Sequence, residues 1–147
     1  MEPLAVAVHC FSLANFHARK VEKIAVFGAG PIGLLCMAVA RALGTARIFA
    51  IDINKDRLEF AKQYAAMDIY VPPSLPLGKQ AEAEIVSSKL EYSKNVAMEM
   101  LGGDADGTGK RLAYKGFDIV IEATGAETCM QTGMYITKPG GTFIQVR

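Results

Sequence analysis

The sequence has almost no excess of charge of either sign, since 16 lysines and arginines stand against 15 aspartates and glutamates. A protein that binds nucleic acid normally gathers a basic excess on one face. No such cluster occurs in these 147 residues. We therefore expect a small molecule or another protein as the partner, and no nucleic acid. The chain is long and hydrophobic enough to bury one sizeable core.

Metal-binding and disulfide-forming residues are also scarce. Cys10, Cys36 and Cys129 lie far apart and form no Cys-x-x-Cys pair, so the sequence indicates neither a structural zinc site nor a disulfide framework. We expect buried free thiols in a reducing compartment. His9 and His17 have no third ligand in step, which favours no metal site in this chain.

A long membrane-spanning run is missing too. The uncharged stretch 24–40 is interrupted by three glycines and a proline, and it is short for a membrane span. Glu2 stands where a secretory signal would carry positive charge. The sequence predicts a soluble, cytoplasmic protein without a membrane partner.

Short apolar runs alternate with helical stretches along the chain. Because strand–helix alternation requires a parallel sheet with right-handed crossovers, we predict a doubly wound α/β fold with about five strands and helices on both faces. The predicted strands cover 24–27, 47–52, 68–71, 117–122 and 142–146. The predicted helices cover 3–16, 31–43, a stretch capped by Asn54, 81–101 and 127–137, with a loop at 102–109.

A glycine motif, Gly28-Ala29-Gly30-Pro31-Ile32-Gly33, lies between the first strand and its helix. In that position the first glycine permits a sharp turn, the second lets a pyrophosphate approach the backbone, and the third lets helix and strand pack closely. The free amides and the dipole at the helix start attract phosphate. The motif predicts a Rossmann-type dinucleotide site.

An acid at the end of the second strand is the other half of this signal. Asp52 follows Gly33 by 19 positions, where a carboxylate accepts both hydroxyls of the adenine ribose and repels the 2′-phosphate of NADP. NAD is therefore the expected cofactor. Asp52 as a helix cap or a solvated turn residue is the alternative. Arg57, one turn into the next helix, either contacts the adenosine side or is a solvated surface residue.

With these residues in hand, the chain resembles the medium-chain zinc-dependent alcohol and polyol dehydrogenases. It is most similar to the sorbitol and xylitol dehydrogenases, in their fungal form. The matching pieces follow family order from one end of the chain to the other, and they are 1–9, 26–35, 50–54, 57–62, 122–127 and 138–143.

The resemblance implies a role for each site residue. The motif residues Gly28, Gly30, Pro31, Ile32 and Gly33 would line the pyrophosphate, Asp52 and Arg57 would hold the adenosine ribose, and the backbone near Val146 would face the nicotinamide. Glu2 would be the catalytic carboxylate that points from a linking helix, residues 1–20, into the zinc and substrate site. The reaction implied is hydride transfer from a polyol to NAD, with a ketose as product.

The resemblance also implies what is missing. The family's remaining zinc ligands and its structural zinc lobe lie in a catalytic domain that this chain does not contain, so zinc is expected only in a full-length enzyme. The family's last strand should follow Val146, but the sequence ends at Arg147. We expect residues 21–147 to be a truncated NAD-binding domain, inactive by itself, and a homo-oligomer through its uncovered sheet edge.

Two other classes of protein fit parts of the pattern. A non-catalytic NAD-binding or dimerising module would share the fold. A methyltransferase that binds S-adenosylmethionine also ends its first strand in glycines and its second in an acid, but it usually carries an acid before the first glycine, where this chain has Phe27.

Overall fold

The computed structural model describes residues 2–18, 20–75, 82–102 and 116–146. Their strands form one parallel sheet in the order β3-β2-β1-β4-β5. The strands are β1 (Lys23–Phe27), β2 (Arg47–Ile51), β3 (Asp68–Tyr70), β4 (Phe117–Glu122) and β5 (Thr137–Gln145). The predicted doubly wound α/β fold is therefore confirmed.

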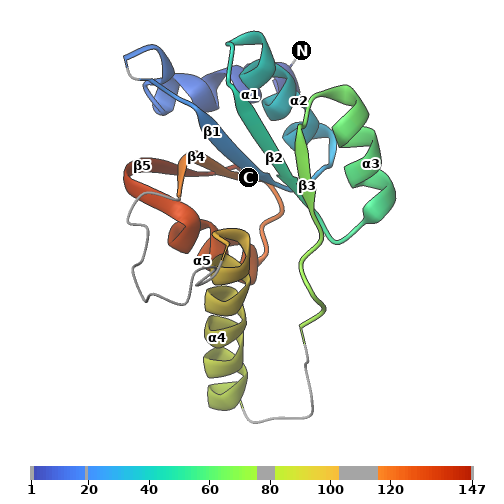
Figure 1. Ribbon diagram of the computed structural model, residues 1–147, viewed down its shortest axis with the longest axis vertical. Helices are drawn as coiled ribbons and strands as arrows, with labels where there is room; N and C mark the ends of the chain where they lie inside the picture. The colour runs from blue at the N-terminus through green and yellow to red at the C-terminus, as the bar shows by residue number, and fades with distance from the viewer. Residues whose placement is uncertain (1, 19, 76–81, 103–115, 147) are drawn as a thin grey trace.

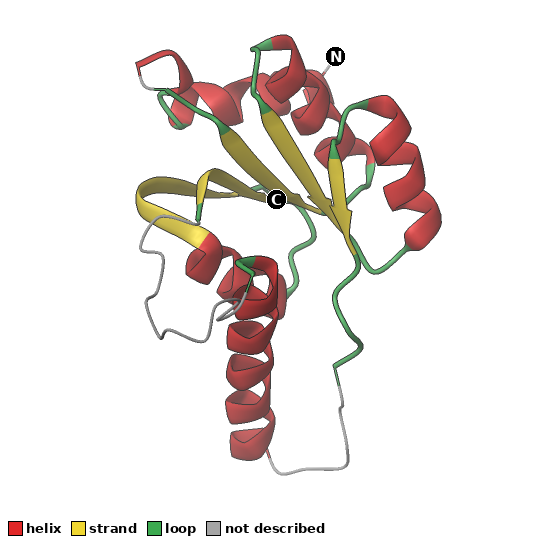
Figure 2. Cartoon of the chain, viewed as in Figure 1, coloured by secondary structure: helices red, strands yellow, loops and turns green. Residues whose placement is uncertain are grey.

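Helices cover the two faces of this sheet (Figure 1). One face carries α1 (Glu2–Leu13), α2 (Pro31–Ala42) and α3 (Lys55–Tyr64), and the other carries α4 (Glu82–Met100) and α5 (Glu127–Ile136). A short 3-10 helix, η1 (Phe16–Ala18), follows α1. Figure 2 shows the two helical layers with the sheet between them.

Side chains of each strand alternate between the two cores. In β1, Ile24 and Val26 pack beneath α2, whereas Ala25 and Phe27 face the α4 and α5 side. Strands buried on both faces read as continuous apolar runs, which is why the strand 24–27 could be predicted from its sequence alone.

The first helix is shorter than predicted. It ends at Leu13 rather than Phe16, because Asn15 takes a left-handed backbone conformation with φ 49°. Asparagine adopts this conformation more readily than most residues. Phe16 then turns back and packs edge-on against Phe11, with ring centroids 5.7 Å apart.

The last strand begins earlier than predicted, at Thr137 rather than Thr142. Thr137 pairs with Phe117, and Thr142 pairs with Ile119, so β5 advances five residues while β4 advances two. The extra residues form a bulge in which Gly140 has φ +76°. The segment Pro139-Gly140-Gly141 thus lies inside the strand. Beyond Gly102, the predicted loop 102–109 lies outside the described residues.

The cysteines follow the prediction in two of three cases. Cys10 and Cys36 are buried free thiols on the packed helices α1 and α2, whereas Cys129 is half-buried. A hydrogen bond between the two buried thiols lowers the pKa of Cys10 to about 7. The same bond, with burial, raises the pKa of Cys36. No helix in the described part of the chain is long and apolar enough to cross a membrane.

Candidate functional site

The candidate site lies at the carboxyl ends of β1, β2 and β4. After β1 the chain builds β2 and β3 on one side, and it then returns to build β4 and β5 on the other. In open parallel sheets, ligands bind where the direction of winding reverses in this way. The glycine motif follows β1 at this position, as predicted.

The glycine turn is tightly built at its first and last glycines. Gly28 has φ +96°, and its backbone N–H donates to the Ile51 carbonyl at 2.7 Å. A Cβ added at Gly33 would lie 1.8 Å from the Gly28 carbonyl oxygen. Only glycine permits this approach between the helix and the end of the strand.

Gly30, by contrast, faces open space. A Cβ added there would meet no atom of the described chain within 4 Å. Gly30 is the N-cap of α2 and offers no side chain to the first amides of the helix, and Pro31 occupies the first helical position. The start of α2 therefore leaves backbone donors for a ligand, at the positive end of the helix dipole. Ile32, half-buried, packs against the core below this start.

Asp52 closes the turn from the side of β2. Its Oδ2 accepts the Ala29 backbone N–H at 2.7 Å, and its Oδ1 accepts the Asn54 N–H at 2.9 Å. The bond from Asn54 to Oδ1 is a local turn contact. The alternative interpretation of Asp52, as a turn residue, therefore applies to Oδ1 only. The first bond places the carboxylate at the glycine turn. A carboxylate offers about four acceptor positions, so both oxygens retain capacity for a ligand.

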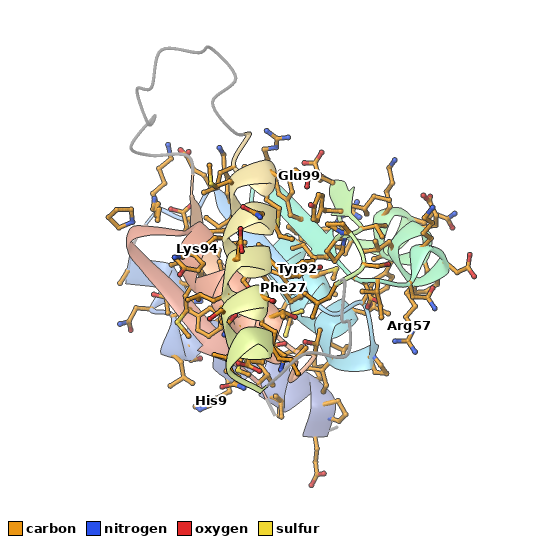
Figure 3. All side chains as sticks on the ribbon, turned by 90° about the horizontal axis from the view of Figure 1, so that it is seen from below. His9, Phe27, Arg57, Tyr92, Lys94 and Glu99 are labelled. Atoms are coloured by element: carbon orange, nitrogen blue, oxygen red, sulfur yellow. The ribbon has the colours of Figure 1, made fainter. Side chains whose placement is uncertain are left out.

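Two exposed residues, Ile53 and Arg57, follow this carboxylate in the sequence. Ile53 is 82% exposed. Arg57 lies in the first turn of α3, where its backbone N–H donates to the Asn54 side chain at 3.1 Å. Its own side chain is exposed and lies at the periphery of the molecule (Figure 3).

Sequence reasoning assigned no role to Glu122, which the structure places beneath the turn that follows β4. Glu122 is fully buried, although it is a charged residue type, and it ends a strand whose residues are all buried. Its Oε1 accepts the Thr124 N–H at 2.7 Å, the Gly125 N–H at 2.9 Å and the Thr124 hydroxyl. Its position matches that of Asp52, because both acids come at the carboxyl end of an apolar strand. That match was the available signal.

Val146 reaches the same edge of the sheet. Its backbone N–H donates to the Glu122 carbonyl at 2.8 Å, directly after β5 ends. Cys129, on α5, lies close by. Burial raises the pKa of the Cys129 thiol, and the carboxylates of Glu122 and Asp52 raise it further, against a hydrogen bond with Thr124.

Glu2 lies apart from this constellation of turns. It is exposed in the first turn of α1, and it lines an open hollow of about 630 Å³ with apolar neighbours on the same helix. His9 lines the same hollow, and Figure 3 shows it at the edge of the molecule, far from Arg57. Within the residues that the structure describes, no three His, Cys, Asp or Glu side chains converge as a metal site.

Comparison with known proteins adds a family to this geometry. A family model described as zinc-binding dehydrogenase matches residues 31–146. The chain belongs to the zinc-binding dehydrogenase family. This agrees with the resemblance drawn from the sequence motifs, and it removes the methyltransferase alternative.

Curated relatives include fungal polyol enzymes. D-xylulose reductase A of Aspergillus oryzae is 43% identical over 145 residues, which cover 99% of this chain and 34% of the relative. The probable D-xylulose reductase A of Aspergillus clavatus is 40% identical over the same length. The chain thus spans about a third of the length of these relatives.

Solved structures give the same picture. An alcohol dehydrogenase from Thermus sp. ATN1 superposes with a TM-score of 0.67 at 26% identity, over 98% of this chain and 33% of that one. A chain from Sinorhizobium meliloti 1021, solved bound to NADP, gives a TM-score of 0.66 at 25% identity, over 97% of this chain and 34% of that one.

Proposed function

We propose that this chain is the NAD-binding part of a zinc-dependent polyol dehydrogenase that oxidises xylitol or sorbitol to a ketose. One observation carries the proposal: the Asp52 carboxylate lies 2.7 Å from the Ala29 amide, beside an open glycine turn at the switch point of the sheet. The family match and the fungal D-xylulose reductases support the activity.

The residues at the strand ends fit a dinucleotide. We assign the pyrophosphate to the start of α2, where Gly30 leaves space and the backbone donors are uncapped. The adenine ribose belongs to Asp52, and the exposed Ile53 offers the adenine an apolar surface. The backbone at Val146 lies on the nicotinamide side. Bound NAD supplies a hydride acceptor for the alcohol carbon.

Asp52 also underlies the proposed preference for NAD. A 2′-phosphate on the ribose would meet this carboxylate and be repelled. A structural relative was solved with NADP, so the fold by itself does not select the unphosphorylated cofactor. Arg57 lies in the first turn of α3, five residues after Asp52, and we propose that it contacts the adenosine side.

The described residues do not fit a zinc ion, because no three ligand side chains converge among them. We therefore propose that the metal and most of the substrate site come from the two thirds of the relatives that this chain does not match. Residues 1–20 would then be the linking helix, with Glu2 directed to that part. Residues 21–147 would be the NAD-binding domain.

The oligomeric state and the location of the proposed enzyme can be proposed as well. Within the described residues β5 pairs only with β4, so its outer edge offers backbone groups to a second copy. We propose a homo-oligomer on this ground. We also propose a reducing, cytoplasmic location, in which the buried thiols Cys10 and Cys36 would stay free.

A non-catalytic NAD-binding or dimerising module is the second candidate. It is favoured by the same absence of converging metal ligands among the described residues. The dehydrogenase and a non-catalytic NAD-binding module both require NAD binding and differ in whether the bound cofactor is reduced, whereas a purely dimerising module does not require NAD.

Calorimetric titration of the purified chain with NAD and with NADP tests the shared premise. We expect NAD to bind at least about tenfold more tightly, because a carboxylate near a phosphate costs a kcal/mol or more (about 1.4 kcal/mol per tenfold). Asp52→Asn keeps the shape of the side chain and removes its charge, so this variant should lose the preference. A wild-type preference for NADP, or no binding of either, would contradict the assignment.

A further inference from the structure

The proposed function assigns no role to Glu122, the buried acid at the end of β4. Glu122 is fully buried, and its Oε2 has no hydrogen-bond partner among the described residues. Buried carboxylate oxygens are costly to leave unpaired. An apolar residue would avoid this cost, so the retained acid calls for a physical account.

Its other oxygen gives that account. Three donors meet at Oε1: the Thr124 amide at 2.7 Å, the Gly125 amide at 2.9 Å, and the Thr124 hydroxyl. The Thr124 oxygen in turn accepts the Ala126 amide at 3.0 Å. Glu122 therefore fixes the turn between β4 and α5 from beneath, while Thr124 and Gly125 are exposed above it.

This turn is packed against the glycine motif. The Ala123 amide donates to the Phe27 carbonyl at 2.9 Å. A Cβ added at Gly28 would lie 3.1 Å from the Thr124 methyl group and 3.3 Å from the Ala123 carbonyl oxygen. The β4 turn thus forms the wall of the site opposite Asp52, because β4 and β2 lie on opposite sides of β1.

We propose that Glu122 is a positioning residue for the nicotinamide half of the bound dinucleotide. The inference rests on the proposed function. With the adenosine at β2 and the pyrophosphate at the start of α2, the remaining half of NAD extends over β4 and β5. The wall it meets is the exposed Thr124–Gly125 turn, whose backbone Glu122 holds in place. Glu122 itself stays buried and acts through that turn.

The test compares NAD with ADP, which carries the adenosine and both phosphates but no nicotinamide riboside. Glu122→Met fills a similar volume and replaces the carboxylate by a thioether, a much weaker acceptor, so three donors lose their strong partner and the turn is released. We expect this variant to weaken NAD binding about tenfold, while ADP binding changes less than about twofold. Glu122→Gln keeps one acceptor oxygen and should fall between Met and the wild type.

Asp118 provides a matched control on the same strand. It is also a buried acid that accepts backbone amides, those of Glu22 at 2.9 Å and Lys23 at 2.8 Å, but it lies at the amino end of the strand. Asp118→Asn should lower the melting temperature and leave the ratio of NAD to ADP affinity unchanged. If Glu122→Met does not fold, Thr124→Val removes the hydroxyl bond from the exposed side and should lower the ratio in the same direction.

The outcomes separate this inference from the proposed function. If the wild type binds neither NAD nor ADP, the proposed function fails. If it binds both, and the Glu122 variants weaken both by the same factor or neither, Glu122 has only a structural role and the inference fails alone. A lower ratio in Glu122→Met with partial rescue in Glu122→Gln supports it.

Discussion

Gly30 and Gly33 stand three residues apart in one motif, but they face opposite surroundings. A side chain at Gly33 would overlap the Gly28 carbonyl, whereas one at Gly30 would meet open space. Gly30 also has an extended backbone, φ −81° and ψ −175°, which any residue adopts. One glycine is therefore required by the fold, and the other is free to serve a ligand.

Alanine substitutions should separate these two requirements. Gly33→Ala should destabilise the protein by roughly 1–3 kcal/mol or more, because helix and strand must move apart. Gly30→Ala should change the free energy of unfolding by less than about 1 kcal/mol, yet weaken NAD binding at least about tenfold, since its methyl group occupies the space assigned to the pyrophosphate. Urea unfolding and NAD titration of both variants measure this.

Equal losses of stability in the two alanine variants would show that a side chain at Gly30 meets other atoms, contrary to the open space at that position. Unchanged NAD affinity in Gly30→Ala would place the pyrophosphate elsewhere. The same two measurements on Asn54→Ala, which removes the N-cap of α3, give a reference for a local loss of about 1 kcal/mol.

At the scale of the elements, Asp118 ties three strands together. Its carboxylate accepts two amides that lead into β1, and it pairs with Lys138 at the start of β5. Burial alone would raise the pKa of Asp118. The bonds from Lys138, Lys23 and Glu22 outweigh burial, and the net pKa lies below the ordinary value.

Because the pKa of Asp118 is lowered in the folded state, the stability that its contacts contribute depends on pH. The folded state binds the Asp118 proton less readily than the unfolded state, so its contribution is present above the unfolded pKa of about 4 and is lost as the pH falls through the lower folded value. We expect Asp118→Asn to cost about 2 kcal/mol at pH 7. The gap to the wild type should narrow as the pH falls below the unfolded value of about 4, measured by urea unfolding.

Parallel acid dependence in the wild type and in Asp118→Asn would contradict this account. Lys138→Met tests the same tie from β5. It should remove part of the depression of the Asp118 pKa, so that the loss of stability below the unfolded pKa is smaller than in the wild type.

At the scale of the whole chain, only part of the length of the related enzymes is matched. The chain matches about a third of the fungal relatives, and the described residues bring no three metal ligands together. Binding of a dinucleotide needs only the strand ends and the first turn of α2. Hydride transfer from an alcohol also needs a group that polarises the substrate oxygen.

We therefore expect the purified chain to bind NAD and to sediment as an oligomer through the β5 edge, without reducing NAD in the presence of xylitol or sorbitol and zinc. Absorbance at the NADH band and analytical ultracentrifugation measure these properties. Measurable turnover would show that the catalytic residues lie within this chain. A monomer at all concentrations would contradict the role given to the β5 edge.

Much of the fold and part of the site could be predicted from sequence, because the signals were local. The buried strands are short apolar runs, Gly28 and Gly33 stand at the end of such a run, and Asp52 ends the next. Boundaries that depend on one backbone conformation, at Asn15 and in the bulge near Gly140, could not be predicted in the same way. The family pieces, spread over the whole chain, indicated the family.

The sequence by itself determined the parallel sheet, the glycine turn and the acid that follows it, since periodicity and turn chemistry act over a few residues. Only the tertiary structure decided that the Asp52 carboxylate reaches the Ala29 amide. It also decided that Glu122 is buried beneath the opposite wall. The Asp52–Ala29 bond joins two segments 23 residues apart, and the burial of Glu122 depends on packing between separate elements, so neither leaves a local pattern in the sequence.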